Sequence, residues 1–159
     1  MKSCFNKLIL IFLAVFLMAA GPVEKSLSLA PNFTIKDLDQ VPVELSSFKN
    51  KKPVVLFFWT TWCPYCLIAL KKFNQSYPEW DKEGIMVMPI NSGEPAANVA
   101  RFAKSNGYSF RIFTDSDSSV SNDYHIYGVP VYFAVDKKGY VRSITNSFPQ
   151  EEMLKLVKE

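Results

Sequence analysis

Residues 54–66, Val54-Val55-Leu56-Phe57-Phe58-Trp59-Thr60-Thr61-Trp62-Cys63-Pro64-Tyr65-Cys66, decide the fold of this chain. The apolar run 54–59 has the length and the β-branched and aromatic content of a buried strand. After it, apolar residues recur with helical spacing at Leu67, Leu70, Phe73 and Tyr77. The stretch therefore predicts a strand that leads through a Cys-x-x-Cys pair into the first turn of a helix. This arrangement is typical of a redox dithiol.

The spacing of the two cysteines suits thiol chemistry. Two intervening residues place the sulfur atoms about one helical turn apart, close enough to form a Cys63–Cys66 disulfide. Cys63 is expected at the helix N-terminus, where unpaired N–H groups and the helix dipole lower a thiol pKa. Pro64 suits the first helical position because it has no N–H. Cys66, one turn deeper, is more shielded. We expect Cys63 to be the nucleophile and Cys66 the resolving cysteine.

Three other interpretations of the pair are a structural disulfide, half of a zinc site, and two space-filling thiols. A structural disulfide gains little from so short a loop, because the stabilisation grows with loop length. A structural zinc site needs four ligands, and the chain offers only His125 and Cys4 besides. The redox interpretation is favoured, and we expect neither a metal site nor a cofactor.

The N-terminus has the layout of an export signal. Residues 8–23 carry no charge, Lys2 and Lys7 precede them, and Ala19-Ala20-Gly21 offers a small-residue cleavage site. Pro22 directly after that site opposes cleavage, so an uncleaved, slightly short membrane anchor is the alternative. In both cases the positive-inside rule places the chain from about Glu24 onward outside the cytoplasm. The predicted organisation is a signal peptide or N-terminal membrane anchor at 1–23, a linker at 24–29 and one domain at 30–159.

Composition limits the classes of function. The 159 residues, 48% of them apolar, support one domain with a core. Removal of residues 1–21 leaves 16 basic and 15 acidic residues, a formal charge of +1, and nothing indicates nucleic acid as a partner. Only the Cys63–Cys66 pair follows the leader, so in an oxidising compartment it is kept for a purpose other than stability.

Strands and helices alternate along the rest of the chain, which favours a three-layer α/β domain. We expect an N-terminal hairpin and a second hairpin that ends the sheet. The expected strands are 33–38, 41–45, 53–59, 85–90, 111–114, 131–135 and 140–145. The expected helices are 63–82, 95–106 with Gly107 as its cap, a short helix within 115–124 with a serine- or aspartate-capped start, and 147–158 after a capping box.

A second motif, Tyr127-Gly128-Val129-Pro130, stands directly before the strand 131–135. Alone it is a common turn signal, and an ordinary trans-proline turn is the alternative. Together with the dithiol it predicts a cis Pro130 that leaves the backbone of Val129 unpaired and facing Cys63. A substrate strand could then pair with Val129 and present its own disulfide in line.

With both motifs in place, the chain resembles the TlpA/ResA branch of the thioredoxin-like superfamily from about Ala30 to the C-terminus. The matching blocks are 30–34 with Leu38, 57–66, Asn91-x-Gly93-Glu94, 115–124, Gly128-Val129-Pro130 and Phe133-x-Val135-Asp136-x-x-Gly139. The resemblance implies a thioredoxin-like α/β/α fold with a central mixed sheet. It also implies a strand–helix insert at roughly residues 88–114.

Members of that branch are exported, often membrane-tethered thiol–disulfide oxidoreductases. Several reduce disulfides, including those of apocytochrome c, with electrons from a membrane reductant of the CcdA or DsbD type. The resemblance implies disulfide-containing exported proteins as substrates, such a reductant as electron donor, and a place in the periplasm or at the outer face of the cytoplasmic membrane. We expect a monomer whose substrate-binding residues are Trp62, Pro64, Tyr65, Val129 and Pro130.

The chain lacks both usual proton-transfer carboxylates: the family often has a glutamate where this chain has Ala69, and plain thioredoxins have a buried aspartate where it has Phe57. Glu94 stands where the family often has glutamate, but we assign it no proton-transfer role. Pro64-Tyr65 between the cysteines is more typical of glutaredoxins, which leaves the direction of electron flow open. A disulfide donor or isomerase, and a Cu(I) or haem-pathway chaperone, are the alternatives. A peroxidase is disfavoured because its Pro-x-x-x-Thr-x-x-Cys block is missing.

Several other residues receive structural interpretations. Trp59 is expected in the core, and His125 is expected to be a solvated or core residue near a helix end. Asp115, Asp117 and Asp123 lack the glycine and terminal glutamate of a calcium loop, so we expect them to form a solvated helix start.

Overall fold

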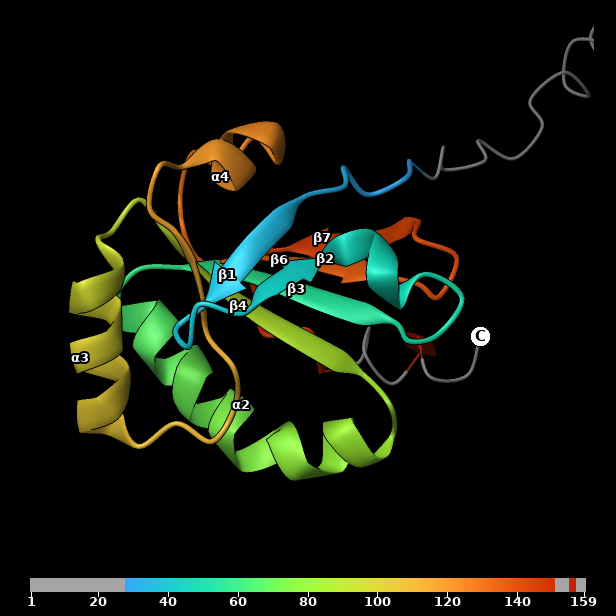
Figure 1. The fold of residues 1–159 in the computed structure, drawn as a ribbon. Helices are drawn as coiled ribbons and strands as arrows, with labels where there is room; N and C mark the ends of the chain where they lie inside the picture. The colour runs from blue at the N-terminus through green and yellow to red at the C-terminus, as the bar shows by residue number, and fades with distance from the viewer. Residues whose placement is uncertain (1–27, 151–154, 157–159) are drawn as a thin grey trace, which may run out of the picture.

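The computed structural model describes residues 28–150 and 155–156 (Figure 1). The predicted signal peptide or anchor, residues 1–23, and residues 24–27 of the predicted linker lie outside the described residues. Within the described ranges, no helix is both long enough and apolar enough to cross a membrane.

A seven-stranded mixed sheet forms the centre of the domain, as predicted, with the strand order β2-β1-β5-β4-β3-β6-β7. The strands are β1 Thr34–Asp37, β2 Pro42–Glu44, β3 Val54–Trp59, β4 Met86–Ser92, β5 Phe113–Asp115, β6 Val131–Val135 and β7 Val141–Thr145. β3 pairs in parallel with β4 and antiparallel with β6. The N-terminal hairpin is β1–β2, and β2 forms one edge of the sheet.

Helices cover both faces of this sheet, which confirms the predicted three layers (Figure 1). Helices α2, Pro64–Lys82, and α3, Ala96–Asn106, lie on one face, and the short α4, Ser119–Asp123, lies on the other. The 3-10 turn η1, Leu45–Phe48, follows β2. Gly107 caps α3 in the left-handed conformation, as predicted, with φ 63°.

All six residues of β3 are buried, because the strand has a neighbour on each side and helices above and below. Its side chains alternate between two apolar clusters. Val55, Phe57 and Trp59 pack toward α2 and α3. Val54, Leu56 and Phe58 pack toward α4 and the N-terminal hairpin. β3, the strand that leads to the dithiol, is therefore held by packing on both faces and by pairing along both edges.

The predicted strand–helix insert corresponds to α3 and β5. After β4, the chain crosses through α3 and returns as β5, which pairs in parallel with β4 and antiparallel with β1. The insert therefore joins the N-terminal hairpin to the rest of the sheet. The predicted last helix, 147–158, lies largely outside the described residues; Gln150, Lys155 and Leu156 are helical, and Leu156 is buried against the same cluster as α2.

Helix α2 continues through Pro78, and Figure 1 shows it changing direction in its second half. Proline has no N–H for the helical hydrogen bond, and its ring clashes with the preceding turn, which explains a bend here. The side chain of Asn74, four residues earlier, accepts hydrogen bonds from the N–H and the hydroxyl of Ser109 at 2.8 and 2.9 Å. These bonds tie the middle of α2 to the loop after α3.

The prediction that Asp115 belongs to a solvated helix start is wrong. Asp115 is buried, and its carboxylate accepts hydrogen bonds from the N–H groups of Val120 and Ser121, at 3.1 and 2.7 Å, and from the hydroxyl of Ser121. The carboxylate therefore satisfies the first N–H groups of α4 from inside the protein. Asp117 and Asp123 are exposed, as expected.

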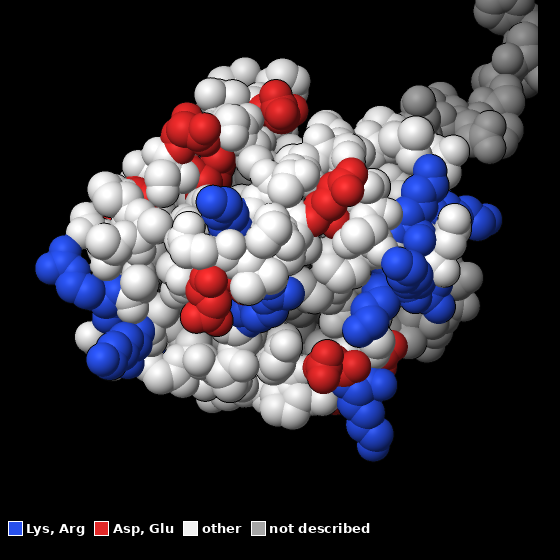
Figure 2. Space-filling model, viewed as in Figure 1, with Lys and Arg blue, Asp and Glu red and all other residues white. Residues whose placement is uncertain are grey.

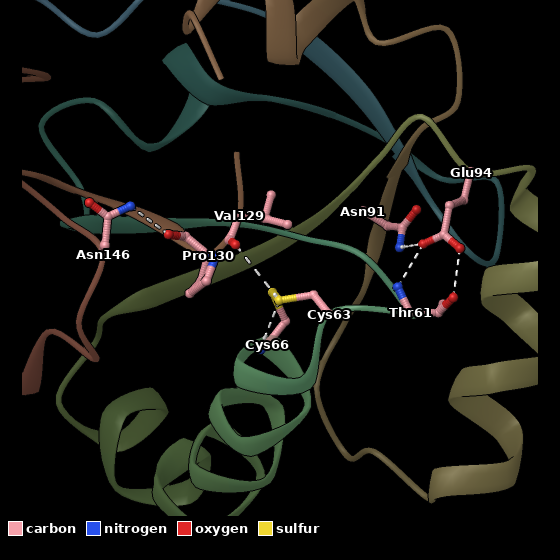
Figure 3. Close-up of a disulfide and its surroundings, with 8 residues drawn as sticks. All are labelled: Thr61, Cys63, Cys66, Asn91, Glu94, Val129, Pro130 and Asn146. Atoms are coloured by element: carbon pink, nitrogen blue, oxygen red, sulfur yellow. Dashed lines mark hydrogen bonds between the residues drawn. A yellow bond between two sulfur atoms is a disulfide. The ribbon is translucent and has the colours of Figure 1, made fainter. Parts of the chain in front are cut away.

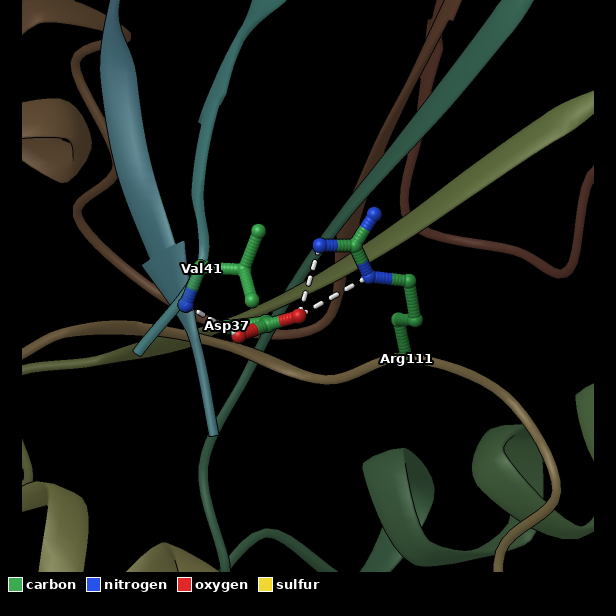
Figure 4. Close-up of polar contacts among 3 residues, drawn as sticks. All are labelled: Asp37, Val41 and Arg111. Atoms are coloured by element: carbon green, nitrogen blue, oxygen red, sulfur yellow. Dashed lines mark hydrogen bonds and ion pairs between the residues drawn. The ribbon is translucent and has the colours of Figure 1, made fainter. Parts of the chain in front are cut away.

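A second buried carboxylate, Asp37 at the end of β1, fastens the insert to the hairpin (Figure 4). It accepts hydrogen bonds from Nε and Nη2 of Arg111 at 2.9 and 2.6 Å, and from the N–H of Val41 at 2.8 Å. Burial alone would raise the pKa of Asp37, but the bonds from Arg111 and Val41 outweigh it. Together they lower the pKa below its ordinary value of 3.8.

We predict that Asp37→Asn lowers the free energy of unfolding by about 1–3 kcal/mol at pH 7, because charge-assisted hydrogen bonds to Arg111 are lost. A carboxyl whose pKa is lowered by folding stabilises the fold above its unfolded pKa, and this contribution is lost as the pH falls through the folded pKa. The difference between Asp37→Asn and the wild type should therefore shrink below about pH 4. Urea unfolding at pH 7 and pH 3 measures both values. Asp39→Asn, an exposed neighbour, is the matched control; an equal loss in that variant would contradict the assignment.

Candidate active site

The two cysteines form a disulfide at the start of α2, with their Cα atoms 5.2 Å apart (Figure 3). Cys63 is the N-cap residue of the helix, in an extended conformation, and Pro64 is the first helical residue. The N–H of Cys66 donates a hydrogen bond to Sγ of Cys63 at 3.1 Å. Cys63 is 4% exposed and Cys66 is fully buried.

This geometry favours a negative charge on the sulfur of Cys63. When the disulfide is reduced, Sγ of Cys63 lies where the helix dipole is positive and where the Cys66 N–H can donate to it. The sulfur of Cys66 lies deeper, among the buried apolar side chains that pack between the sheet and helices α2 and α3. The two thiols are therefore chemically unequal, and Cys63 is the one suited to attack.

The loop before β6 faces the dithiol. The Val129–Pro130 peptide bond is cis, and the carbonyl oxygen of Val129 lies 3.8 Å from Sγ of Cys63. The carbonyl of Pro130 accepts a hydrogen bond from the side-chain amide of Asn146 at 2.8 Å. Figure 3 shows Val129 and Pro130 above the disulfide, with Asn146 to the left of Pro130. Asn146, which follows β7, is a supporting residue that sequence reasoning missed.

Glu94 supports the loop on the other side of the dithiol (Figure 3). Its Oε2 accepts hydrogen bonds from the N–H of Thr61 and from the side-chain amide of Asn91, both at 2.7 Å. Its Oε1 accepts from the hydroxyl of Thr61 at 2.6 Å. These hydrogen bonds connect Glu94 to Thr61, which is two residues before Cys63, and to Asn91 in β4. We therefore interpret Glu94 as a positioning residue that acts on the cysteines through the loop.

Neither of the two positions expected for a proton-transfer carboxylate, that of the TlpA/ResA branch at Ala69 and that of plain thioredoxins at Phe57, holds one. Phe57 is buried and stacks on Tyr132, with ring centroids 4.7 Å apart, and Ala69 is buried in α2. The buried carboxylates of the described residues are Asp37, Asp115 and Asp136. They bind Arg111, the first turn of α4, and Arg142. None of these three buried carboxylates is therefore placed to take the proton of Cys66.

The segments next to the disulfide and the cis-proline carry exposed aromatic side chains. Trp62 is 71% exposed, Tyr65 is 75% exposed, and Tyr127, two residues before Val129, is 94% exposed. Beside them, a groove of about 260 Å³ is lined by residues that include Tyr65, Ile68, Pro130 and Phe148. Trp62 and Tyr65 were predicted to border the dithiol. Tyr127 was missed, although it belongs to the motif that contains Pro130.

Other candidate residues lie elsewhere. Trp59 is fully buried, as predicted, and His125 is exposed just after α4. In the part of the chain that the structure describes, no group of three or more His, Cys, Asp and Glu side chains could hold a metal ion.

A buried strand that ends in a helix-capping Cys-x-x-Cys disulfide, opposite a cis-proline loop, defines a redox protein of the thioredoxin-like class. Residues 28–144 match the model of the AhpC/TSA family, and the chain belongs to this family. The predicted resemblance to the TlpA/ResA branch is confirmed by its curated relatives.

Two of these relatives are named thiol-disulfide oxidoreductase ResA. The protein from Geobacillus thermodenitrificans is 35% identical over 128 residues, which are 80% of this chain and 73% of that protein. The protein from Bacillus subtilis is 31% identical over 125 residues, which are 79% and 69% of the two chains. The present chain is therefore an enzyme, a thiol–disulfide oxidoreductase.

Solved structures confirm the fold. A putative thiol:disulfide interchange protein DsbE from Chlorobium tepidum has a TM-score of 0.74 at 21% identity, over 82% of this chain and 96% of that one. StoA from Bacillus subtilis has a TM-score of 0.68 at 23% identity, over 80% and 98% of the two chains.

We predict that Glu94→Ala lowers kcat/KM for disulfide reduction about tenfold, because the loop before Cys63 loses its two hydrogen bonds from Thr61 to Glu94 and the nucleophile is less well positioned. Glu94→Gln should keep most of the activity, since its amide oxygen can still accept from the N–H of Thr61. Initial rates with a model disulfide, with the exposed Glu83→Ala as control, measure the effect. A Gln variant as impaired as the Ala variant, with an altered pH profile, would instead indicate proton transfer.

Proposed function

We propose that this enzyme reduces disulfides in exported proteins. The observation that carries the proposal is the position of the Cys63 sulfur: it caps α2 and lies 3.8 Å from the Val129 carbonyl, beside an exposed aromatic surface. An extended substrate segment could pair with the backbone of Val129 and bring its disulfide to Cys63. Trp62, Pro64, Tyr65, Val129 and Pro130 are the proposed contacts.

The exchange proceeds in two steps. The thiolate of Cys63 attacks one sulfur of the substrate disulfide; that bond breaks, a mixed disulfide forms, and one substrate thiolate leaves and takes up a proton. Cys66 then loses its proton and attacks Sγ of Cys63, which releases the second substrate thiol and closes the Cys63–Cys66 disulfide. The substrate gains two electrons and the enzyme loses two. A separate dithiol must reduce the enzyme before the next cycle.

The proposed location is outside the cytoplasm, in the periplasm or at the outer face of the cytoplasmic membrane. The basic, apolar and small-residue pattern of residues 1–23 supports export, either as a cleaved signal or as a retained anchor. The resemblance to the TlpA/ResA branch supports a membrane reductant of the CcdA or DsbD type as electron donor. It also supports apocytochrome c among the substrates, and we propose that the enzyme acts as a monomer.

We predict that Cys63→Ser abolishes disulfide reductase turnover, while Cys66→Ser accumulates mixed disulfides through Cys63. The first variant lacks the attacking sulfur, and the second cannot resolve the intermediate. Non-reducing gels after incubation with a disulfide-containing protein detect the trapped species. Circular dichroism checks that both variants are folded. Full activity in both variants would overturn the proposed chemistry.

The reduction potential of the Cys63–Cys66 pair decides the direction of electron flow. Dithiols of this type span about −120 to −270 mV. A value near the reducing end supports a reductase, whereas a value near −120 mV would favour a disulfide donor or isomerase. Stoichiometric, tight Cu(I) binding by the reduced protein without reductase turnover would instead favour a thiol-based chaperone.

We predict that Tyr127→Ser raises KM for a protein disulfide about fivefold, because an aromatic contact of about 1 kcal/mol is lost at the substrate surface. The rate with a small disulfide should be unchanged, since such a substrate does not reach Tyr127. Val41→Ser, which removes an exposed apolar side chain from the hairpin, is the control. If Tyr127→Ser affects both substrates equally, or neither, this residue is not a substrate contact.

A further inference from the structure

Five exposed lysines gather at the end of the sheet where β3 begins, and we refer to them as the lysine end. Lys49, Lys51 and Lys52 precede β3, and Lys137 and Lys138 form the turn between β6 and β7. The N–H of Asn50 donates to the carbonyl of Lys137 at 2.6 Å, which joins the two segments. Figure 2 shows basic side chains concentrated on this side of the molecule.

The neighbouring carboxylates offset only part of this positive charge. Asp136 is buried and bound to Arg142, with its other oxygen accepting from the N–H of Tyr140. Glu44 accepts hydrogen bonds from Asn32 and Ser46 and keeps its negative charge. Glu83 is exposed three residues before Met86, which pairs with Val54 at the start of β3. The five lysines outnumber these two exposed carboxylates. The chain without residues 1–21 carries a formal charge of only +1, so the lysine end is a local concentration of charge and not a property of the whole surface.

The lysine end lies where the chain joins the domain from its N-terminal side. The carbonyl of Ser28 accepts from the N–H of Val141, and the N–H of Ala30 donates to the carbonyl of Gly139, both at 2.9 Å. A Cβ on Gly139 would lie 3.8 Å from the side chain of Leu29 and 3.9 Å from that of Lys49. The first described residues therefore pack against the lysine end.

The length of the connection limits how far this end can lie from an apolar N-terminal segment. Residues 8–23 are uncharged and apolar, and only residues 24–27 separate them from Ser28. Four residues span at most about 14 Å when fully extended. This distance is close to the range over which charges act at physiological salt, about 8–10 Å. If residues 8–23 occupy a bilayer, the five lysines lie within reach of its lipid headgroups.

An apolar cavity opens at the same place. It has a volume of about 180 Å³ and is lined by residues that include Leu29, Leu45, Phe48 and Val54, with Lys49 and Lys52 also lining it. Leu29 is itself half exposed. Apolar side chains next to cations suit an amphiphile that carries a negative headgroup, and they suit a lipid surface better than a purely acidic partner.

We propose that the lysine end binds the surface of an anionic phospholipid bilayer. This inference rests on the proposed export and the proposed membrane anchor, because these bring the domain to a bilayer. The disulfide is at the opposite end of β3, a strand of six residues that spans about 20 Å. A domain bound through its lysines therefore presents Cys63 away from the bilayer. In this bound state the disulfide is accessible to soluble substrate proteins, and reaction with the proposed membrane reductant requires the domain to leave the lipid surface.

The test uses the full chain in lipid nanodiscs of phosphatidylcholine alone, or with about one third phosphatidylglycerol. Hydrogen exchange followed by mass spectrometry reports on residues 46–53 and 135–142. We expect exchange in both segments to slow about tenfold in the anionic discs and to recover in 0.5 M NaCl, because salt screens the attraction. Equal exchange in the two kinds of disc, or slowing on another face of the domain, would overturn the proposal.

A matched pair of variants separates the lysine end from general charge. Lys51→Gln/Lys52→Gln/Lys138→Gln should lose the slowing, since each lysine near an anionic surface contributes severalfold in affinity. Lys36→Gln/Lys71→Gln/Lys104→Gln removes the same charge from exposed positions elsewhere and should keep it. Equal behaviour of the two variants would contradict the proposal.

Two further readouts keep this inference distinct from the proposed function. Disulfide reductase activity is measured on each preparation, so that loss of the enzyme's chemistry is seen separately from loss of lipid binding. If the full chain does not remain with the disc, flotation with phosphatidylglycerol and phosphatidylcholine vesicles replaces the exchange measurement. Flotation with only the anionic vesicles supports the lysine end as the binding surface, and flotation with neither, or equally with both, rejects it.

Discussion

The complete burial of β3 is the constraint on which the rest of the structure depends. Its side chains fill both apolar clusters, and its two edges are paired with β4 and β6. The register of this strand is fixed, because a shift by one residue would turn every side chain to the opposite face of the sheet and disrupt the packing of both clusters. The antiparallel partner β6 starts at Val131, opposite Phe58. The residues just after β3 and just before β6 therefore meet at one edge, and this brings Cys63 and Pro130 together from positions 67 residues apart in the chain.

Local sequence was sufficient for the elements with strong periodicity. The run 54–59 and the helical spacing after Cys63 predicted β3 and α2 to within one residue, because burial on both faces and a capped helix leave clear patterns. The hairpins and α3 were predicted for similar reasons. Fold class followed from the order of these elements and from the family resemblance, which also implied a strand–helix insert at roughly residues 88–114.

Features that depend on distant residues were not visible in the sequence. The polar residues around Asp115 predicted a solvated helix start. Asp115 is instead buried, because α4 packs against β4 and β5. Glu94 is 33 residues from Thr61, and only the folded sheet brings its carboxylate to the loop before Cys63. Tyr127 is exposed because the loop before β6 leaves the sheet, a matter of tertiary geometry. Exposure at a loop cannot be told from burial by residue type alone.

The sulfur of Cys63 has a second role as the N-cap of α2, and this couples the redox state to the stability of the fold. A thiolate is a stronger hydrogen-bond acceptor than a disulfide sulfur, so the cap is stronger in the reduced enzyme. By a thermodynamic cycle, any extra stability of the reduced fold equals the amount by which folding eases reduction of the disulfide. About 1.4 kcal/mol corresponds to about 30 mV for a two-electron couple. The difference in unfolding free energy between the reduced and the oxidised enzyme therefore equals the shift in reduction potential between the unfolded and the folded chain.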